Sequence, residues 1–216
     1  MEMKAENKKM MNSPKAELKE RIIDAAMDAF MKHGIKSITM DDIANSLSMS
    51  KRTLYETFKD KEDLLIACLE HKEKLMREFM EEVAQESENV LEIILKFYKK
   101  TIEVYHNTNK RFFEDMNKYP RVMEMNRTNR QHNSEDAIRF FKKGVEQGIF
   151  RRDLNFEIIN LLTREQFNLL IHTNFCKDYS FVEVYESIMF VYMRGISTEK
   201  GQKILEDLIK EYRQYK

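Results

Sequence analysis

The sequence predicts an all-α protein. Only 5 Gly and 2 Pro occur in 216 residues, which leaves long segments without a helix breaker. Apolar residues recur three or four positions apart along most of the chain, and no segment shows the strict alternation that is typical of a strand. We expect a flexible polar tail over residues 1–12, a small helical domain over residues 13–60, and a larger one over residues 61–216.

The composition excludes several classes of protein. Lys and Arg number 37 and are matched by 37 Asp and Glu, and the chain is 42% hydrophobic and 34% charged, as in soluble globular proteins. No apolar run reaches the ~18 residues of a membrane span, and the N-terminus lacks the apolar stretch of a signal peptide. Cys68 and Cys176 lie too far apart for a zinc ribbon or a disulfide framework. We therefore expect a cytoplasmic protein without a metal site and without membrane contact.

The first two helices are predicted from their end signals. Ser13 can cap a helix that has Pro14 in its first turn, and Gly34 supplies the left-handed residue that ends it. Thr39 and Asp42 have the spacing of a capping box, in which a hydroxyl and a carboxylate three residues later satisfy free amides. A second helix is therefore expected to begin directly after Thr39.

A tight turn at residues 48–50 separates this helix from a third. Ser50 can cap a short helix over Lys51–Phe58, and Asp60 and Asp63 repeat the signal for a long helix that begins at Lys61. Further helices are expected near residues 89–106, 109–118, 120–147, 156–176, 180–195 and 199–215, with breaks at Pro120, Gly144, Gly148, Asp178, Ser180 and Gly195.

Two short helices joined by a three-residue turn describe a helix-turn-helix. Leu54 and Phe58 can anchor the back of the second helix, which leaves a polar face for the major groove of DNA. Residues 48–61 hold four basic side chains against two acidic ones, a net charge of +2 that the zero balance of the whole chain conceals. The overall neutrality is therefore no argument against nucleic acid.

The stretch TMDDIANSLSMSKRTLYETFKDKEDLL (residues 39–65), preceded by IIDAAMDAFMKHGIKSITM, resembles the DNA-binding domain of the TetR family of transcriptional regulators. The resemblance covers roughly residues 18–70 and includes a T-x-x-D-I-A helix start, an S-K-x-T-L-Y recognition helix and an F-x-x-K-E-D-L junction, in that order. GVEQGIFRRDLN (144–155) is similar to the loop before the family's dimerising helices. The resemblance implies a three-helix DNA-binding domain followed by a larger ligand-binding and dimerisation domain, linked by the helix that begins at residue 61.

The resemblance also implies which side chains meet DNA. Arg52 would pair with a guanine or, equally well, with a phosphate, and Lys51 and Thr53 would face base edges beside it. Thr39, Lys61 and the Tyr55 hydroxyl would meet phosphates. The alternatives are a core position for Tyr55 and a merely solvated Lys61. The full set of expected DNA contacts is Thr39, Ser50, Lys51, Arg52, Thr53, Tyr55, Thr57 and Lys61.

Two positions depart from the family pattern. Ser48 stands where the family usually has Gly, so the turn must accommodate a β-carbon or shift its dihedral angles, at a cost of about 1 kcal/mol. Glu56 places a carboxylate on the recognition helix, where it would repel phosphate but could accept a hydrogen bond from a cytosine amine. The operator sequence stays open for this reason.

By the same resemblance, two helices near residues 156–175 and 181–193 pair the subunits of a homodimer. The expected interface residues are Ile158, Leu162, Phe167, Leu170, Val184, Ile188, Met189 and Tyr192.

The aromatic central helices would enclose a small hydrophobic or aromatic inducer, although an ordinary helical core gives the same pattern. The expected pocket residues are Phe97, Tyr98, Tyr105, Phe112, Phe113, Met116, Met123, Phe140 and Phe167.

The sequence thus predicts a ligand-released repressor that binds a palindromic operator on double-stranded DNA as a homodimer, and it predicts no cofactor. An activator of the same fold is the nearest alternative. An enzyme is disfavoured because the chain lacks GxxxxGK[ST], GxGxxG and HExxH and holds one Glu-x-x-His spacing, Glu103 to His106. The remaining alternative is a helical scaffold that has lost its DNA role.

Overall fold

The computed structural model describes residues 13–172 and 179–214, without the side chains of residues 130–133, 167–172 and 214. No strand forms among these residues, and Phe150 and Ser197 make an isolated antiparallel bridge. The all-α fold is confirmed. The helices are α2 (Pro14–His33), α3 (Met40–Ser46), α4 (Lys51–Thr57), α5 (Lys61–Glu86), α6 (Val90–His106), α7 (Lys110–Met116), α8 (Pro120–Glu146), α9 (Phe156–His172), α11 (Phe181–Ile196) and α12 (Glu199–Gln214).

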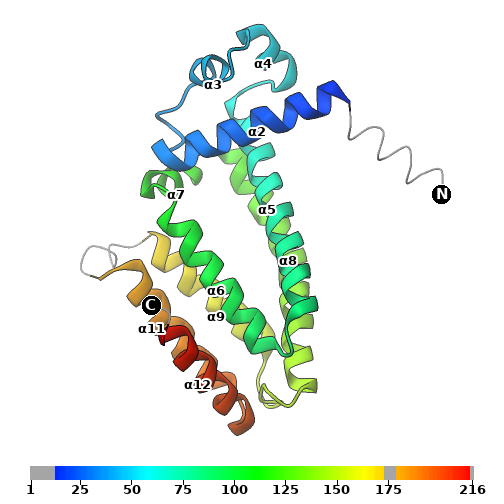
Figure 1. Ribbon diagram of the computed structural model, residues 1–216, viewed down its shortest axis with the longest axis vertical. Coiled ribbons are helices and arrows are strands. Elements are labelled where there is room, and N and C mark those ends of the chain that lie inside the picture. The colour runs from blue at the N-terminus through cyan, green and yellow to red at the C-terminus, as the bar shows by residue number, and fades with distance from the viewer. Residues whose placement is uncertain (1–12, 173–178, 215–216) are drawn as a thin grey trace, which may run out of the picture. The chain divides into compact units, whose positions relative to one another are not determined.

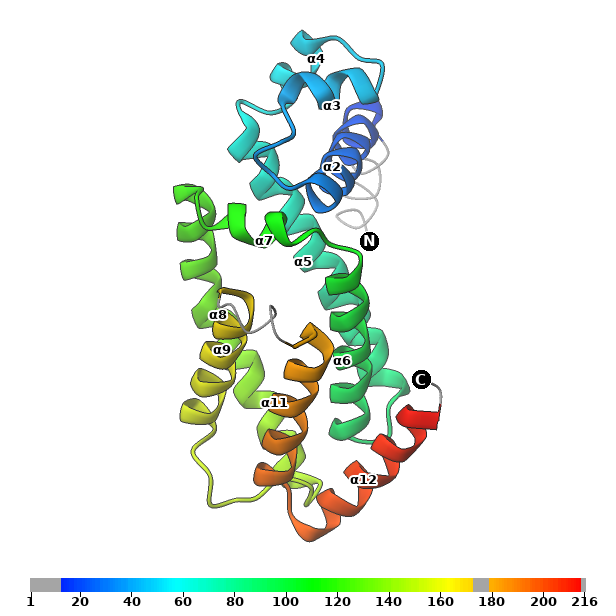
Figure 2. The same cartoon turned by 90° about the vertical axis from the view of Figure 1, so that its left-hand side faces the viewer.

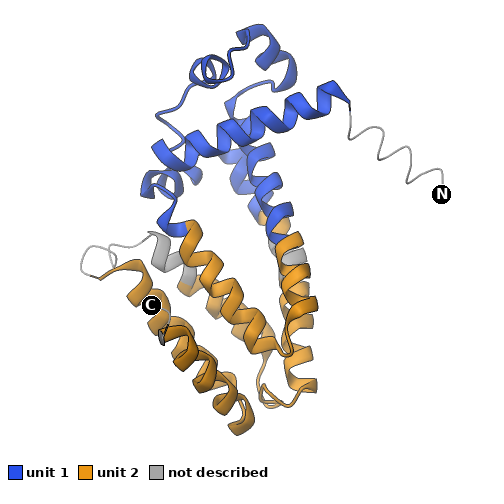
Figure 3. Cartoon of the chain, in the orientation of Figure 1, with its two compact units in different colours: residues 1–77, 105–126 blue, residues 78–104, 127–216 orange. Residues whose placement is uncertain are grey.

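The chain divides into two compact units, shown in Figure 3. Unit 1 runs to Arg77 and also takes in Tyr105–Asn126, whereas unit 2 comprises Glu78–Val104 and Arg127–Lys216. The boundary expected at residue 60 assigns every segment after it to the larger domain. The compact units instead place α7 and the start of α8 with the N-terminal helices, because these segments share one core.

The predicted end signals act as expected in the first helices. Ser13 Oγ accepts from the Ala16 N–H at 3.2 Å, and Gly34, at φ 84°, donates its N–H to the Phe30 carbonyl. The left-handed region suits a glycine, and a β-carbon there would lie 2.7 Å from Arg111 Cβ. Gly34 therefore both ends α2 and makes room for α7.

The turn between α3 and α4 contains Ser48, one of the two positions that depart from the family pattern. Ser48 has φ 51° and is the one described non-glycine residue with a positive φ. Met49 donates its N–H to the Ala44 carbonyl at 3.0 Å, and Ala44 is fully buried. The turn thus keeps its helix-turn-helix geometry around a serine and stores the strain of a left-handed β-carbon.

The core of unit 1 explains why α7 belongs to it. In Figures 1 and 2, α3 and α4 lie on one side of α2, and α7 lies on the other. Phe112 of α7 and Val122 of α8 are buried in the same apolar cluster as the side chains of α2 to α5. The ammonium of Lys72 on α5 lies 5.9 Å from the centre of the Phe112 ring and 3.7 Å from Met31 Sδ, and burial lowers its pKa. Fully buried members of the cluster are Ile22, Ala26, Phe30, Ile35, Ala44, Leu54, Leu64, Leu65, Cys68 and Val122.

Unit 2 is built around the rings of Phe141, Phe150 and Phe156, which pack at 5.0 to 6.4 Å. The expected break at Gly144 is wrong, since α8 continues to Glu146. The glycine is needed for close approach instead, because a β-carbon there would lie 2.1 Å from Phe150 Cδ2. The chain turns at Gly148, which has φ 70°.

The remaining boundaries follow the predicted ones closely. The break expected at Gly195 lies one residue too early, because α11 ends at Ile196. The tail at residues 1–12 and the end expected for the helix near residue 176 lie outside the described residues. None of the described helices is long and apolar enough to cross a membrane.

Candidate nucleic-acid interface

The helix α4 presents a polar face over an apolar back. Leu54 and Phe58 are buried in the core of unit 1, as predicted. Lys51, Arg52 and Tyr55 are exposed on the helix, so the alternative core position for Tyr55 is excluded. An exposed short helix held by its apolar back is the geometry that enters a major groove in helix-turn-helix proteins.

Both basic side chains at the start of α4 are paired with carboxylates. Lys51 Nζ contacts Asp41 of α3, and this hydrogen bond raises the pKa of Lys51. Arg52 Nε donates to Glu56 Oε1 at 2.8 Å, one helical turn further on. The two cations that were expected to face base edges are therefore each paired with a neighbouring acid.

The hydroxyl groups of the interface hold the backbone of α4. Ser50 Oγ accepts from the Thr53 N–H at 3.1 Å and lies 2.8 Å from Thr53 Oγ1. Thr57 Oγ1 donates to the Thr53 carbonyl at 3.0 Å. Ser50 is thus the N-cap of α4, and a further role of these hydroxyls in phosphate contacts stays a prediction.

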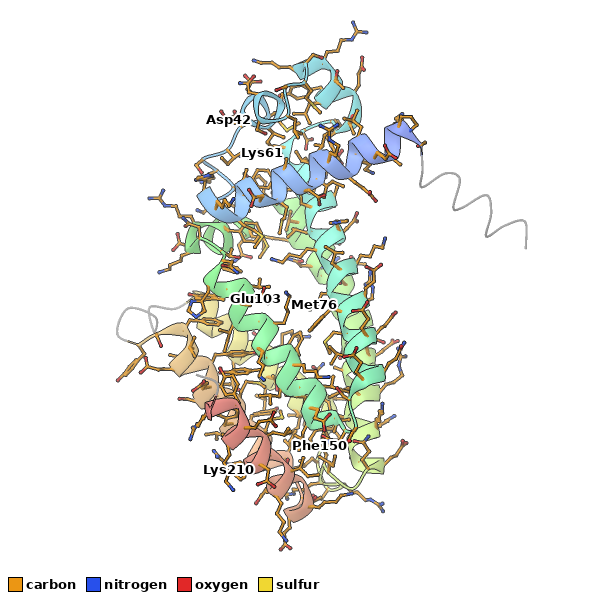
Figure 4. All side chains as sticks on the ribbon, viewed as in Figure 1. Asp42, Lys61, Met76, Glu103, Phe150 and Lys210 are labelled. Carbon is orange, nitrogen blue, oxygen red and sulfur yellow. The ribbon has the colours of Figure 1, made fainter. Side chains whose placement is uncertain are left out.

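Thr39 and Lys61 lie at the starts of α3 and α5. Thr39 Oγ1 accepts from the Asp42 N–H at 3.1 Å, the Asp42 carboxylate accepts from Thr39, and these hydrogen bonds lower the pKa of Asp42. Lys61 Nζ lies 5.8 Å from the centre of the Phe30 ring. Burial lowers the pKa of Lys61, while Asp115 and Asp42 act in the opposite direction. Figure 4 labels Asp42 and Lys61, which both belong to unit 1.

Contacts from α7 to the loop after α2 were not predicted from the sequence. Asn109 donates its backbone N–H to the Met31 carbonyl at 2.7 Å and its side-chain amide to the Lys32 carbonyl at 3.1 Å. Asp115, which is 6% exposed, accepts from the Lys36 N–H. These contacts cap the end of α2 and fix the loop that leads into the helix-turn-helix.

A second group of contacts between residues far apart in the sequence joins the starts of α5 and α8. The backbone N–H of Arg121 donates to Glu62 Oε1 at 2.7 Å, which satisfies a free amide in the first turn of α8. The Arg121 guanidinium contacts Asp63 at 3.0 Å and Asp60 at 3.4 Å. Arg121 thus counterbalances acidic side chains that flank Lys61, where negative charge would repel a phosphate.

The expected dimer residues of unit 2 take two kinds of position. Ile158 and Leu162 are exposed, whereas Val184, Ile188 and Met189 are half-buried. Tyr192 Oη donates to the Ile159 carbonyl at 2.5 Å and so joins α11 to α9 within one subunit. The side chains of Phe167 and Leu170 lie outside the described residues. Sequence reasoning missed the exposed Leu161 and Val191, which have the same apolar character.

The expected pocket residues are distributed over both units. Phe112, Phe113 and Met116 pack in or against the core of unit 1, and Tyr105 stacks on Phe113 with ring centres 5.8 Å apart. Of the remaining residues, Tyr98 and Phe140 pack within unit 2, Phe97 and Met123 are exposed, and Phe167 lies outside the described side chains.

The described residues contain no group of three or more His, Cys, Asp or Glu side chains that could hold a metal ion. Glu103, which begins the Glu-x-x-His spacing noted in the sequence, lies 2.9 Å from Lys100 Nζ (Figure 4). This side chain is thus already paired within α6.

Comparison with known proteins agrees with this geometry. Residues 22–68 match the model of the bacterial regulatory proteins of the tetR family. The HTH-type transcriptional regulator YhgD of Bacillus subtilis (strain 168) is 30% identical over 81 residues, which is 38% of this chain and 39% of that protein. The chain thus matches about two fifths of the length of this relative.

Solved structures show the same fold over most of the chain. A TetR-family regulator from Marinobacter aquaeolei VT8 has a TM-score of 0.70 at 18% identity, covering 90% of this chain and 98% of that one. A regulator from Saccharomonospora viridis, solved in complex with choline, has a TM-score of 0.67 at 15% identity, covering 85% and 100%. These likenesses show the fold of the chain, and residues 22–68 are similar to the helix-turn-helix domain of the bacterial tetR regulatory proteins.

Proposed function

We propose that the chain is a repressor that binds a palindromic operator as a homodimer and leaves it when a small hydrophobic or aromatic ligand binds. The observation that carries the proposal is α4, whose polar side chains are exposed while Leu54 anchors its back in the core. A single helix-turn-helix reads one short half-site, and dimers bind two half-sites about one helical turn apart. On this proposal the protein acts where the chromosome is, in the cytoplasm, and catalyses no reaction.

Exposed apolar side chains on α9 and α11 support the dimer. Ile158, Leu161 and Leu162 on α9 are exposed, and Val191 on α11 is 70% exposed. Apolar surface that gathers in this way marks an interaction site in soluble proteins. Tyr192 keeps the two helices together, which favours a two-helix surface that pairs with its copy.

The aromatic content of the helical body supports a ligand. A cavity of about 10 Å³ lies among side chains of α6, α11 and α12, including Tyr98, Met189 and Phe190. This volume admits no more than about one water molecule, so a ligand there would have to displace side chains. To shift a repressor from 99:1 to 1:99 between its two states, the ligand needs about 10⁴-fold tighter binding to one of them. The Saccharomonospora viridis protein, which has a similar fold, was solved in complex with choline, and this supports a small-molecule ligand for the chain.

A gel-shift experiment tests the proposal. The wild-type protein should retard a duplex from the region upstream of its own gene, and Arg52→Ala should weaken that band much more than a band with unrelated DNA. A transcription assay from the same region separates the two family roles, because a repressor lowers transcript yield and an activator raises it. Absence of a retarded band at low salt, with and without cell extract, would exclude the regulator function.

A further inference from the structure

The recognition helix carries an acid that the proposed DNA contacts do not use. Glu56 is exposed, and its Oε1 accepts from Arg52 Nε at 2.8 Å. The side chain of Arg52 is 88% exposed and that of Glu56 62% exposed, so both extend from α4 into solvent. The acid therefore lies beside a residue that was expected to read a base.

Helix stability gives little reason for this pair. A carboxylate near the end of a helix faces the negative end of its dipole, and Glu56 is the sixth of seven residues in α4. The order Arg followed by Glu is also the weaker one for an i,i+4 pair. An exposed ion pair in water contributes little to folding in any case. The pair is thus better explained by what it does to Arg52.

The pair leaves one edge of the guanidinium for DNA. Arginine has five N–H donors in a rigid planar fork, and here Nε is taken by Glu56. No other described residue contacts the Nη1 and Nη2 donors of Arg52 through an ion pair or hydrogen bond. These donors match the O6 and N7 acceptors of a guanine in the major groove.

We propose that Glu56 is a positioning residue for Arg52, holding the guanidinium by Nε so that Nη1 and Nη2 meet a guanine. The inference rests on the proposed function of α4 in DNA binding. An Arg–Glu pair has no net charge, so it adds little to phosphate affinity and acts on base preference instead. A side chain that is already oriented also loses less freedom on binding, which is the general advantage of preorganisation.

Selection from duplexes with a randomised 20-bp segment tests this proposal. Wild-type protein, Arg52→Ala, Glu56→Ala, Glu56→Gln and the double Arg52→Ala/Glu56→Ala variant would each be used, and affinities for the enriched and for an unrelated duplex would be measured. Glu114→Ala is the matched control, because Glu114 belongs to another exposed i,i+4 pair, with Lys110 at 3.7 Å, away from α4. Thermal unfolding of each variant verifies that it is folded.

Wild-type protein should enrich a guanine at one position that Arg52→Ala no longer selects. Glu56→Ala should lose about two- to twelve-fold of the preference at that same position, the range expected for freeing one long side chain. It should bind the unrelated duplex at least as well as wild type. Glu56→Gln, which keeps an acceptor oxygen, should retain part of the preference. The double variant should match Arg52→Ala, and Glu114→Ala should match wild type.

Two results would overturn the inference. If Glu56→Ala tightens binding to both duplexes equally and leaves the base preference intact, Glu56 only repels phosphate. If Glu56→Ala relaxes a different base pair, and does so in the Arg52→Ala background as well, Glu56 reads a base itself. A wild-type protein that enriches no sequence would instead exclude the proposed function, a failure visible before any variant is compared.

Discussion

The Asp115 carboxylate of α7 accepts a hydrogen bond of 2.8 Å from the backbone N–H of Lys36, which precedes it by 79 positions. Lys118 donates to the other carboxylate oxygen at 2.9 Å. Lys36 lies in the loop between α2 and α3, so one buried side chain fixes the approach to the helix-turn-helix from a segment far away in the sequence. The compact unit that contains the helix-turn-helix is therefore larger than the three helices that define this motif.

Asp115→Ala should lower the free energy of unfolding by about 1–3 kcal/mol, because it leaves the Lys36 N–H and the Lys118 ammonium without their acceptor. Urea denaturation measures this loss. Asp28→Ala is a control of the same chemistry, since Asp28 forms an exposed pair with Lys32 and its removal should cost much less. Equal losses for the two variants would mean that the Asp115 contacts contribute nothing beyond a surface ion pair.

The stabilisation from Asp115 should depend on pH in the acidic range. Burial raises the pKa of Asp115, but the hydrogen bonds from Lys118 and Lys36 outweigh it and hold the pKa below its ordinary value. A carboxyl with a lowered native pKa stabilises fully above its unfolded pKa of about 3.9 and loses this contribution as the pH falls through the native value. The stability difference between wild type and Asp115→Asn, measured by denaturation, should be constant above about pH 5 and shrink below about pH 4. A difference that grows on acidification would contradict this sign.

Local signals predicted most of the helices, and long-range contacts explain what they missed. The caps at Ser13, Thr39 and Ser50 act between residues three apart, so the sequence contains both partners within one turn. Asp115 has no such signal, because its partner Lys36 is remote and an isolated Asp in a polar segment is usually solvated. The role of Gly144 was missed for the same reason. The ring that leaves no room for a β-carbon at this position belongs to Phe150, in the following loop.

The exposure of the basic residues on α4 was predicted from the sequence, but their ion pairs were not. The helical period placed Lys51 and Arg52 on the exposed face of α4, as the structure has them. Their partners Asp41 and Glu56 depend on rotamers and on the angle between α3 and α4, which periodicity does not specify. The exposure of Val191 could not be predicted either. Apolar residues occur around much of α11, so their pattern does not indicate which face is exposed.

Ser48→Gly should stabilise the protein by about 0.5–1 kcal/mol. The substitution relieves the left-handed strain at φ 51°, and the greater freedom of glycine in the unfolded chain offsets part of the gain. Thermal or urea unfolding measures the change. Ser48→Ala keeps the β-carbon and should give no such gain, so an equal gain from alanine would assign the effect to the hydroxyl and not to the backbone.

Val191→Arg should prevent the proposed dimer from forming, because it places a charge in the middle of an apolar interface. Sedimentation equilibrium should show a monomer for this variant and a dimer for wild type, and operator affinity should fall with the loss of the second half-site. Leu75→Arg is the matched control, since Leu75 is also an exposed apolar residue but belongs to α5. If Leu75→Arg dissociates the protein and Val191→Arg does not, the subunits pair through a different surface.

Lys61→Ala should weaken binding to operator and to unrelated DNA by the same factor, because the proposed role of this ammonium at the start of α5 is to contact a phosphate and not a base. The slope of log affinity against log salt concentration should become shallower by about one unit, the expected effect of one lost phosphate contact. Lys210→Ala removes the same charge from α12 in unit 2 and should leave the slope unchanged (Figure 4). Because burial lowers the pKa of Lys61, the wild-type affinity should also begin to fall at a lower alkaline pH than an ordinary lysine would produce. An unchanged salt slope in Lys61→Ala would assign Lys61 a structural role over the Phe30 ring and remove it from the DNA interface.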